Sequence, residues 1–129
     1  MLFNDVHKLR FKLPRRTNRI LIEKKTPTNN DQSWYNLYSD GWCEQGGYYT
    51  ITSNVFTSFN LLKEMADTKY TITGSSAGET ASVYTVNFAY LTTTTFNAKT
   101  GNASSGKFSW QACGYTSARF IQYLEMYVS

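Results

Sequence analysis

The stretch that decides the fold runs from Trp34 to Gly47 and reads Trp-Tyr-Asn-Leu-Tyr-Ser-Asp-Gly-Trp-Cys-Glu-Gln-Gly-Gly. Asp40-Gly41 separates two runs of strand-forming residues, and this dipeptide is a preferred two-residue hairpin turn because both residues tolerate positive φ. A two-residue loop predicts that Ser39 faces Trp42, Tyr38 faces Cys43 and Leu37 faces Glu44. Gly46 and Gly47 then predict a bulge or a close approach of another backbone.

Further short strands are predicted on both sides of this hairpin. The expected segments are 19–25, 48–56, 70–73, 83–90, 91–96 and 107–115, and 118–128 reads as a strand more than as a helix. The Thr92–Thr95 run fits a strand by composition, whereas 74–84 and 97–106 are polar and predict loops. About seven or eight short strands predict an all-β fold, a compact antiparallel β-sandwich.

Composition supports a β domain with a separate basic segment. Aromatic residues make up 16% of the 129 residues, including ten tyrosines, and only 17% are charged, which favours polar-faced strands over salt-bridged helices. Residues 1–25 carry eight basic and two acidic residues, whereas the remainder carries five basic and seven acidic. We therefore divide the chain into a basic N-terminal arm, 1–18, and a β-sandwich domain, 19–129.

The residue types that catalysis and metal binding require are scarce. The single histidine, His7, lies in the arm, and Cys43 and Cys113 have no histidine near them, so we expect no nucleophilic triad, metal site or cofactor. Both cysteines are expected to be reduced and buried. Glycosidases need only two carboxylates, which keeps Asp40 with Glu44, and Asp67 with Glu79, as candidates for a polysaccharide-cleaving site.

Two kinds of partner are not expected. The basic residues belong to the arm rather than to a folded face, which does not favour nucleic acid as a partner. No apolar run approaches the length of a membrane span, so we expect no membrane insertion.

The motif Trp34-Tyr35-x-x-Tyr38-Ser39-Asp40-Gly41-Trp42-Cys43-Glu44-Gln45-Gly46-Gly47 resembles a signature of phage tail-fibre C-terminal domains. Three further segments agree in order, so that the resemblance covers about residues 19–115: 21–28, 56–72 (ending in Asp-Thr-x-Tyr-Thr-Ile) and 110–115 (Trp-x-Ala-Cys-Gly-Tyr). The chain departs from the pattern by lacking a long preceding shaft and by continuing over 116–129.

The resemblance implies a sandwich similar to an H-type lectin, assembled as a homotrimer at the tip of a tail fibre in the virion after synthesis in the bacterial cytoplasm. It implies adhesion to a host-surface glycan or protein without catalysis, in contact with other tail or virion proteins. It supplies no receptor-binding positions. Its signature residues read as scaffold, with core tryptophans: Trp34, Tyr35, Asp40, Gly41, Trp42, Glu44, Gln45, Gly46, Gly47 and Trp110.

Receptor contacts are expected instead on the two polar loops. Aromatic faces stack on sugars and amides bond to hydroxyls, which selects Tyr84, Asn97, Lys99 and Asn102 as the predicted binding residues. The alternative function is a structural docking subunit that uses its basic arm to bind a larger assembly.

Overall fold

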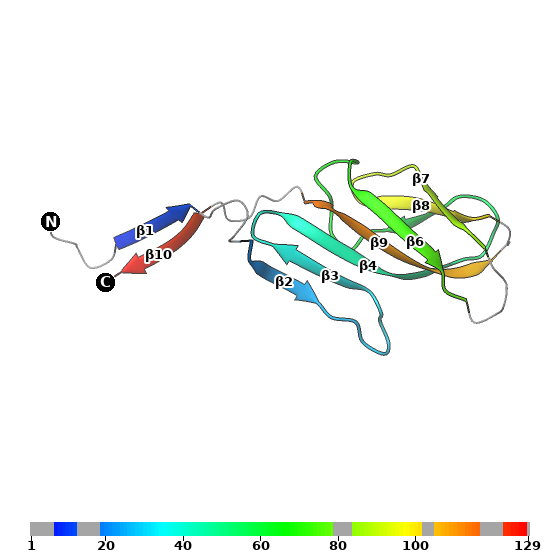
Figure 1. Ribbon diagram of the computed structural model, residues 1–129, viewed down its shortest axis with the longest axis horizontal. Helices are drawn as coiled ribbons and strands as arrows, with labels where there is room; N and C mark the ends of the chain where they lie inside the picture. Colours follow the sequence, from blue (N-terminus) through cyan, green and yellow to red (C-terminus); the bar gives the residue numbers. More distant parts are fainter. Residues whose placement is uncertain (1–6, 13–18, 79–83, 102–104, 117–122, 129) are drawn as a thin grey trace.

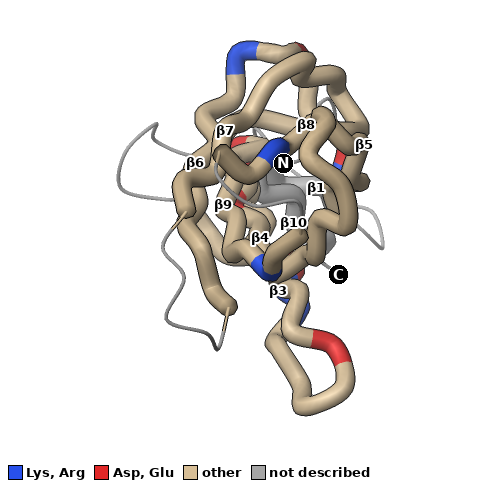
Figure 2. The backbone as a smooth tube through the Cα atoms, turned by 90° about the vertical axis from the view of Figure 1, so that its right-hand side faces the viewer, with Lys and Arg blue, Asp and Glu red and all other residues tan. Residues whose placement is uncertain are grey.

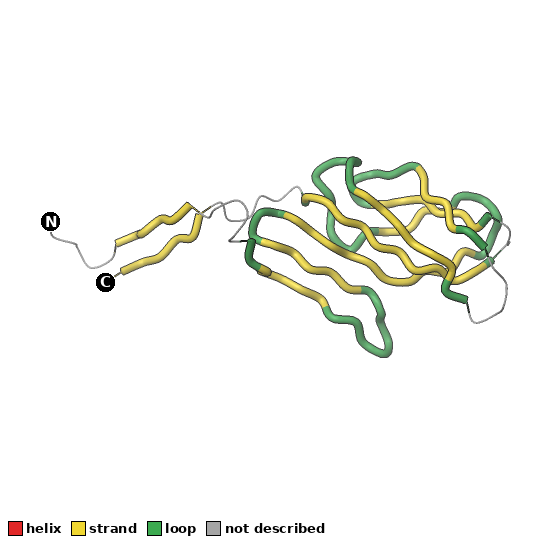
Figure 3. The backbone as a smooth tube through the Cα atoms, viewed as in Figure 1, coloured by secondary structure: helices red, strands yellow, loops and turns green. Residues whose placement is uncertain are grey.

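Two antiparallel sheets face each other and form a β-sandwich. The computed structural model describes residues 7–12, 19–78, 84–101, 105–116 and 123–128, and this part of the chain contains strands but no helix (Figure 3). The larger sheet has five strands in the order β2-β3-β4-β9-β6, and the smaller has three in the order β5-β8-β7. Figure 2 views the two layers end-on. The predicted all-β sandwich is confirmed.

The strands follow the chain with short connections (Figure 1). The larger sheet contains β2 (Leu21–Lys25), β3 (Trp34–Tyr38), β4 (Trp42–Ile51), β6 (Thr71–Ser76) and β9 (Gly106–Tyr115). The smaller sheet contains β5 (Thr57–Asn60), β7 (Val86–Ala89) and β8 (Thr95–Thr100). The chain therefore passes from one sheet to the other after β4, β5, β6 and β8.

The segments outside the sandwich form a two-stranded ribbon. β1 (His7–Lys12) pairs antiparallel with β10 (Tyr123–Val128), with His7 opposite Val128 and Lys12 opposite Tyr123. Figure 1 shows this ribbon beyond one end of the sandwich. Part of the segment predicted as an arm and part of the C-terminal extension are thus strand partners.

The β3–β4 hairpin is present, but the predicted register is wrong by one residue. Leu37 pairs with Cys43, and the Gly41 N–H donates to the Tyr38 carbonyl at 2.9 Å. Gly41 has φ of 90°, so the connection is a three-residue loop whose last residue is left-handed. Because side chains alternate between faces, the shift changes which residues of the two strands face the core: Leu37, Cys43 and Gln45 are buried.

β4 continues straight through Gly46-Gly47, with an unbroken register against β9 from Trp42 to Ile51. The two glycines therefore mark a close approach of neighbouring residues to β4 and not a bulge. A Cβ at Gly46 would lie 2.5 Å from the Trp110 carbonyl oxygen and 2.9 Å from the Trp34 ring. Only glycine leaves room for that ring and carbonyl.

The Thr92–Thr95 run forms a turn, so the predicted strand over 91–96 is wrong. The Thr92 hydroxyl accepts the Thr94 N–H at 3.2 Å and the Thr95 N–H at 2.9 Å. Local side-chain bonds of this kind compete with strand pairing. β8 begins only at Thr95 and takes in 97–100, which the sequence had placed in a loop.

Aromatic rings fill the space between the sheets. Tyr49 stacks on Trp110 with ring centroids 5.8 Å apart and on Phe59 at 4.8 Å. Phe96 and Phe108 are completely buried beside them. The rings connect β4 and β9 of one sheet to β5 and β8 of the other, so the two sheets share one core.

The two cysteines lie on opposite faces of the larger sheet and are free. Cys43 pairs with Gly114, and Cys113 pairs with Glu44, which places Cys43 inside and Cys113 outside. Cys43 is buried as predicted, and burial raises the pKa of its thiol to about 12. Cys113 is only half-buried.

Gln45 joins the larger sheet to the segment after β5. Its side chain is completely buried; Oε1 accepts the Leu62 and Lys63 N–H groups at 2.7 and 3.0 Å, and Nε2 donates to the Lys63 carbonyl at 3.0 Å. All three bonds go to main-chain groups that have no strand partner of their own.

Replacing Gln45 tests this connection. Gln45→Leu keeps the approximate size but removes the acceptor for two N–H groups, so we expect a loss of about 2–4 kcal/mol in the free energy of unfolding. Urea unfolding followed by tryptophan fluorescence measures it. Gln111→Leu, at an exposed position of β9, is the matched control and should change stability by less than about 0.5 kcal/mol. Equal stability of the two variants would contradict the role given to Gln45.

Candidate functional site: an aromatic platform and a loop groove

Two of the four predicted binding residues lie together on the outer face of the smaller sheet. Asn97 and Lys99 are two positions apart in β8, where the alternate residues Phe96, Ala98 and Thr100 are buried. Tyr84 is placed differently: only 7% of it is exposed, and its hydroxyl donates to the Lys107 carbonyl at 2.5 Å. Tyr84 is therefore an internal anchor in this structure. Asn102 lies outside the described residues.

Phe56 and Tyr90 extend the surface around Asn97 and Lys99. Tyr90 is 71% exposed and Phe56 is 38% exposed, and their rings meet edge to face with centroids 5.5 Å apart. The Lys99 Nζ lies 5.9 Å from the Phe56 ring centroid, and the Asn97 amide donates to the Tyr90 carbonyl at 3.5 Å. We call these four residues the aromatic platform.

Small polar residues surround the platform on the neighbouring strands. Ser58 of β5 and Ala89 of β7 are the register partners of Asn97, and Asn87 of β7 is the partner of Lys99. Ser58 and Asn87 are exposed. The face therefore presents two large rings bordered by hydroxyl, amide and ammonium groups on a rigid sheet.

Tyr90 holds an unusual backbone conformation. Its φ is 52°, and among the described residues no other non-glycine residue has positive φ. The left-handed region is unfavourable for residues with a Cβ, and such strain collects at functional sites. A large, exposed, strained aromatic residue identifies this turn as a candidate for recognition.

Sequence reasoning missed Phe56 and Tyr90 because it placed both inside strands. Phe56 precedes β5 and Tyr90 follows β7, so both residues lie just outside the strands. The alternation of inward and outward side chains therefore does not determine whether they are buried. The signal that could have identified Tyr90 is the Thr-rich turn immediately after it.

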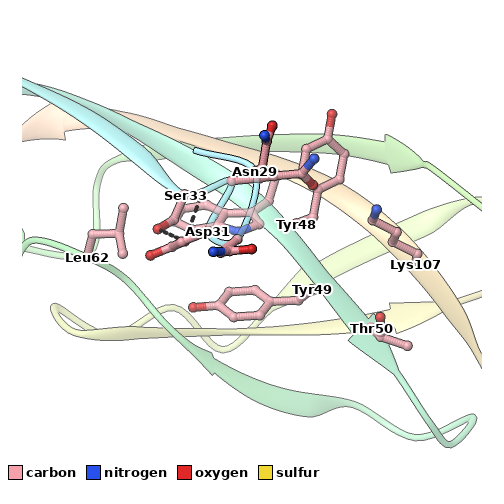
Figure 4. Close-up of a pocket in the computed structure, with 11 residues that line it drawn as sticks. Asn29, Asp31, Ser33, Tyr48, Tyr49, Thr50, Leu62 and Lys107 are labelled. Carbon is pink, nitrogen blue, oxygen red and sulfur yellow. Dashed lines mark hydrogen bonds between the residues drawn. The ribbon is translucent and has the colours of Figure 1, made fainter. Parts of the chain in front are cut away.

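A second candidate site is a hollow beside β4, where the 26–33 loop runs past the strand. This loop groove has a volume of about 650 Å³ and is lined by 11 residues, among them Asn29, Asp31, Tyr48, Lys107 and Trp110. Figure 4 shows Leu62 and Lys107 at its opposite ends.

The loop is held by its own hydrogen bonds. Asp31 accepts the Ser33 N–H and hydroxyl at 3.0 and 2.6 Å and forms an ion pair with Lys25 at 3.1 Å. The Ser33 hydrogen bonds, followed by Lys25, lower the pKa of the Asp31 carboxyl to about 2. Asp31 is therefore ionised at all physiological pH values, with its charge balanced by Lys25 at the end of β2.

The predicted scaffold residues divide between the core and the outer face of the larger sheet. Trp110 is 3% exposed, as expected for a core residue. Trp34 and Trp42 are half-buried on the outer face, so their prediction as core residues is wrong. The register shift places Leu37 rather than Trp34 on the face of Cys43, and alternation along β4 turns Trp42 away from the buried Cys43. The Arg19 guanidinium lies 5.3 Å from the Trp42 ring centroid and pairs with Asp40 at 2.7 Å.

The carboxylates considered for catalysis already have structural contacts. Asp40 accepts the Trp42 N–H at 3.1 Å within the hairpin turn, and Glu44 accepts the Tyr38 hydroxyl at 3.2 Å. Asp67 caps its own turn by accepting the Lys69 N–H at 2.8 Å, and Glu79 lies outside the described residues. In the described segments, no group of three or more His, Cys, Asp or Glu side chains could hold a metal ion.

Comparison with solved structures relates this sandwich to R2-type pyocin tail fibres. The chain is similar to the C-terminal part of the R2 pyocin fibre of Pseudomonas aeruginosa and to an N-truncated R2-type pyocin tail fibre. Each comparison gives 21% identity and a TM-score of 0.52 over 72% of this chain. The chain spans 26% and 38% of those two chains, so the shared part is one portion of a longer fibre.

No protein-family model matches the sequence, and no curated protein matches it. At this level of identity the comparison establishes the fold, which is one that pyocin tail fibres also contain.

In the described segments there is no helix with the length and apolarity needed to cross a membrane.

The strain at Tyr90 can be measured by comparing two truncations. Tyr90→Ala and Tyr90→Gly both remove the ring, but only alanine keeps a Cβ in the left-handed conformation. We expect the glycine variant to be more stable by about 1 kcal/mol in urea unfolding. Ala89→Gly, one residue earlier in β7, should be destabilising, because glycine weakens an ordinary strand position. If Tyr90→Ala is as stable as Tyr90→Gly, residue 90 is not strained.

Proposed function

We propose that this chain is a non-enzymatic adhesion module of a phage or pyocin-type tail fibre, and that it binds a glycan or protein on the surface of a host bacterium. The observation that carries the proposal is the aromatic platform, an exposed pair of rings beside an amide and a lysine. Its setting, a fold that R2 pyocin fibres also contain, supports the tail-fibre context. The proposed location is the fibre tip of the virion.

The chemistry of the platform favours recognition over turnover. Exposed aromatic faces contribute large contact area with few rotatable bonds, and amide and hydroxyl groups supply directional hydrogen bonds. Tyr90 and Phe56 offer the rings, and Asn97 offers the amide. A face of this kind can bind a sugar ring or a short peptide segment with modest affinity.

Modest affinity at one site becomes strong attachment when several copies act together. We propose that the chain works as a homotrimer joined to other tail proteins, as the resemblance of its Trp34–Gly47 motif implies. Three copies facing one cell surface would raise the apparent affinity through effective concentration, without any new contact. No cofactor is needed for this role.

A second candidate function is docking within the tail, and the ribbon favours it. β1 carries Lys8, Arg10 and Lys12, and it pairs with β10 away from the sandwich in Figure 1. A basic ribbon of this kind could bind an acidic surface of a neighbouring tail protein. Reversing these three charges to glutamate in the full chain should then prevent incorporation into tails while leaving cell binding unchanged.

Binding of the purified full chain to a glycan array and to a panel of bacterial cells tests the main proposal. We expect selective binding by a species of three times the monomer mass, and at least a tenfold loss of apparent affinity in the double variant Tyr90→Ala/Asn97→Ala. The expected size follows from removing one hot-spot aromatic ring and one amide. Circular dichroism verifies that the fold is kept.

Lys69→Ala is the control, because Lys69 is exposed and lies between β5 and β6, outside the platform. It should bind like the unmodified protein. Unchanged binding by Tyr90→Ala/Asn97→Ala would contradict the platform as the receptor site. A folded protein that binds no cell or glycan would instead favour the docking role.

A further inference from the structure

The loop groove exists because β4 is longer than its neighbour β3. Their pairing reaches Trp34 opposite Gly46, whereas β4 continues to Ile51 with β9 as its partner. The 26–33 loop passes this free edge, with Ser33 packed against Gly47 and Asp31 beyond it. The result is a hollow along the free edge of β4, where the inward-facing Tyr49 and Trp110 and the outward-facing Tyr48 and Lys107 all contribute to the lining.

A buried donor without an acceptor lines this groove. Trp110 is 3% exposed, and its indole N–H has no hydrogen-bond partner among the described residues. The Nε1 atom lies 3.5 Å from the position that a Cβ would occupy at Gly47, next to Ser33 at the wall of the groove. Buried N–H groups are nearly always paired, so an unpaired one beside a cavity indicates that a ligand or water supplies the acceptor.

The groove also has a positive charge that no described acidic residue balances. Lys107 lies over the Tyr48 ring, with Nζ 4.8 Å from the ring centroid, and it forms no ion pair with a described residue. Asp31, the one acidic residue in the lining, is already bonded to Ser33 and Lys25. The free charge of the site is therefore that of an ammonium group.

The remaining lining suits a sugar ring. Tyr48 is 45% exposed at the rim. Asn29, Asn30 and Gln32 carry side-chain amides for which the structure has no hydrogen bond within the described residues. Because the loop is fixed by the Thr28–Asp31 bonds of 2.7 and 3.1 Å, these amides are presented without a large cost in ordering.

We propose that the loop groove is a second binding site, and that its ligand is a saccharide unit with an anionic group, a carboxylate or a phosphate. The anionic group pairs with Lys107, the ring lies against Tyr48, and an oxygen of the sugar accepts the Trp110 N–H. An acidic sugar satisfies both the unpaired donor and the unbalanced charge, whereas a neutral sugar satisfies only the donor. This site goes beyond the platform and does not depend on it.

The indole N–H of Trp110 is itself the reporter for the test. The full chain contains three tryptophans, each giving one indole resonance in a ¹⁵N correlation spectrum. The probes are methyl glucuronide, glucose 6-phosphate and methyl glucoside, titrated separately at low salt. We expect the Trp110 resonance to shift with one or both anionic sugars, which also identifies the anionic group, and to shift at least tenfold more weakly with the glucoside.

Lys107→Gln supplies the matched change, because it removes the charge from an exposed side chain and keeps a polar end on a shorter stem. It should weaken the anionic sugar at least tenfold and leave the glucoside unchanged, and Lys69→Gln should change neither. Equal binding of charged and neutral sugars, or unchanged affinity in Lys107→Gln, would overturn the proposal. So would an unshifted Trp110 resonance with every probe. Tyr90→Ala/Asn97→Ala should bind the groove probes normally, which separates this site from the platform.

Discussion

The sandwich depends on one buried amide. Gln45 projects from the centre of the larger sheet and holds the main chain at Leu62 and Lys63, the segment that leads away from β5 of the smaller sheet. A buried amide that is fully bonded is specific, because a shift of either partner leaves groups without hydrogen bonds. Phe59, two residues after β5 begins, is thereby kept in contact with Tyr49. This contact belongs to the aromatic core that the two sheets share.

β8 connects that core to the proposed function. Its buried positions, Phe96 and Ala98, pack inside, and the alternate positions Asn97 and Lys99 form the platform outside. Because the inward side chains of β8 are packed in the core, the strand is held in place. Its outward side chains therefore lose less conformational entropy when they bind a ligand. The strained turn at Tyr90 and the Thr92 bonds that follow it set where the platform ends.

The sequence supported the sandwich and the hairpin because Asp-Gly between strand-forming runs is a strong local signal. The sequence could not distinguish a two-residue loop from a three-residue loop, since both place Gly41 at positive φ. The one-residue difference in loop length determines whether Trp34 or Leu37 faces the core. Asn97 and Lys99 were selected by residue type, although a loop was expected there. Phe56 was not identifiable as part of the site, because its contact with Tyr90 depends on the pairing of β5 and β7 with β8. Tyr84 was selected for its exposed-loop context, and its burial depends on its bond to Lys107 of β9.

The most direct test of the platform as the receptor site is a residue-resolved map of where a receptor touches the protein. Amide and side-chain resonances would be recorded while the full chain is titrated with the best ligand from the glycan array. We expect the largest shifts on Ser58, Asn87, Tyr90 and Asn97, on the outer face of the smaller sheet. Shifts confined to the β1–β10 ribbon, or to the far ends of the larger sheet, would contradict this expectation.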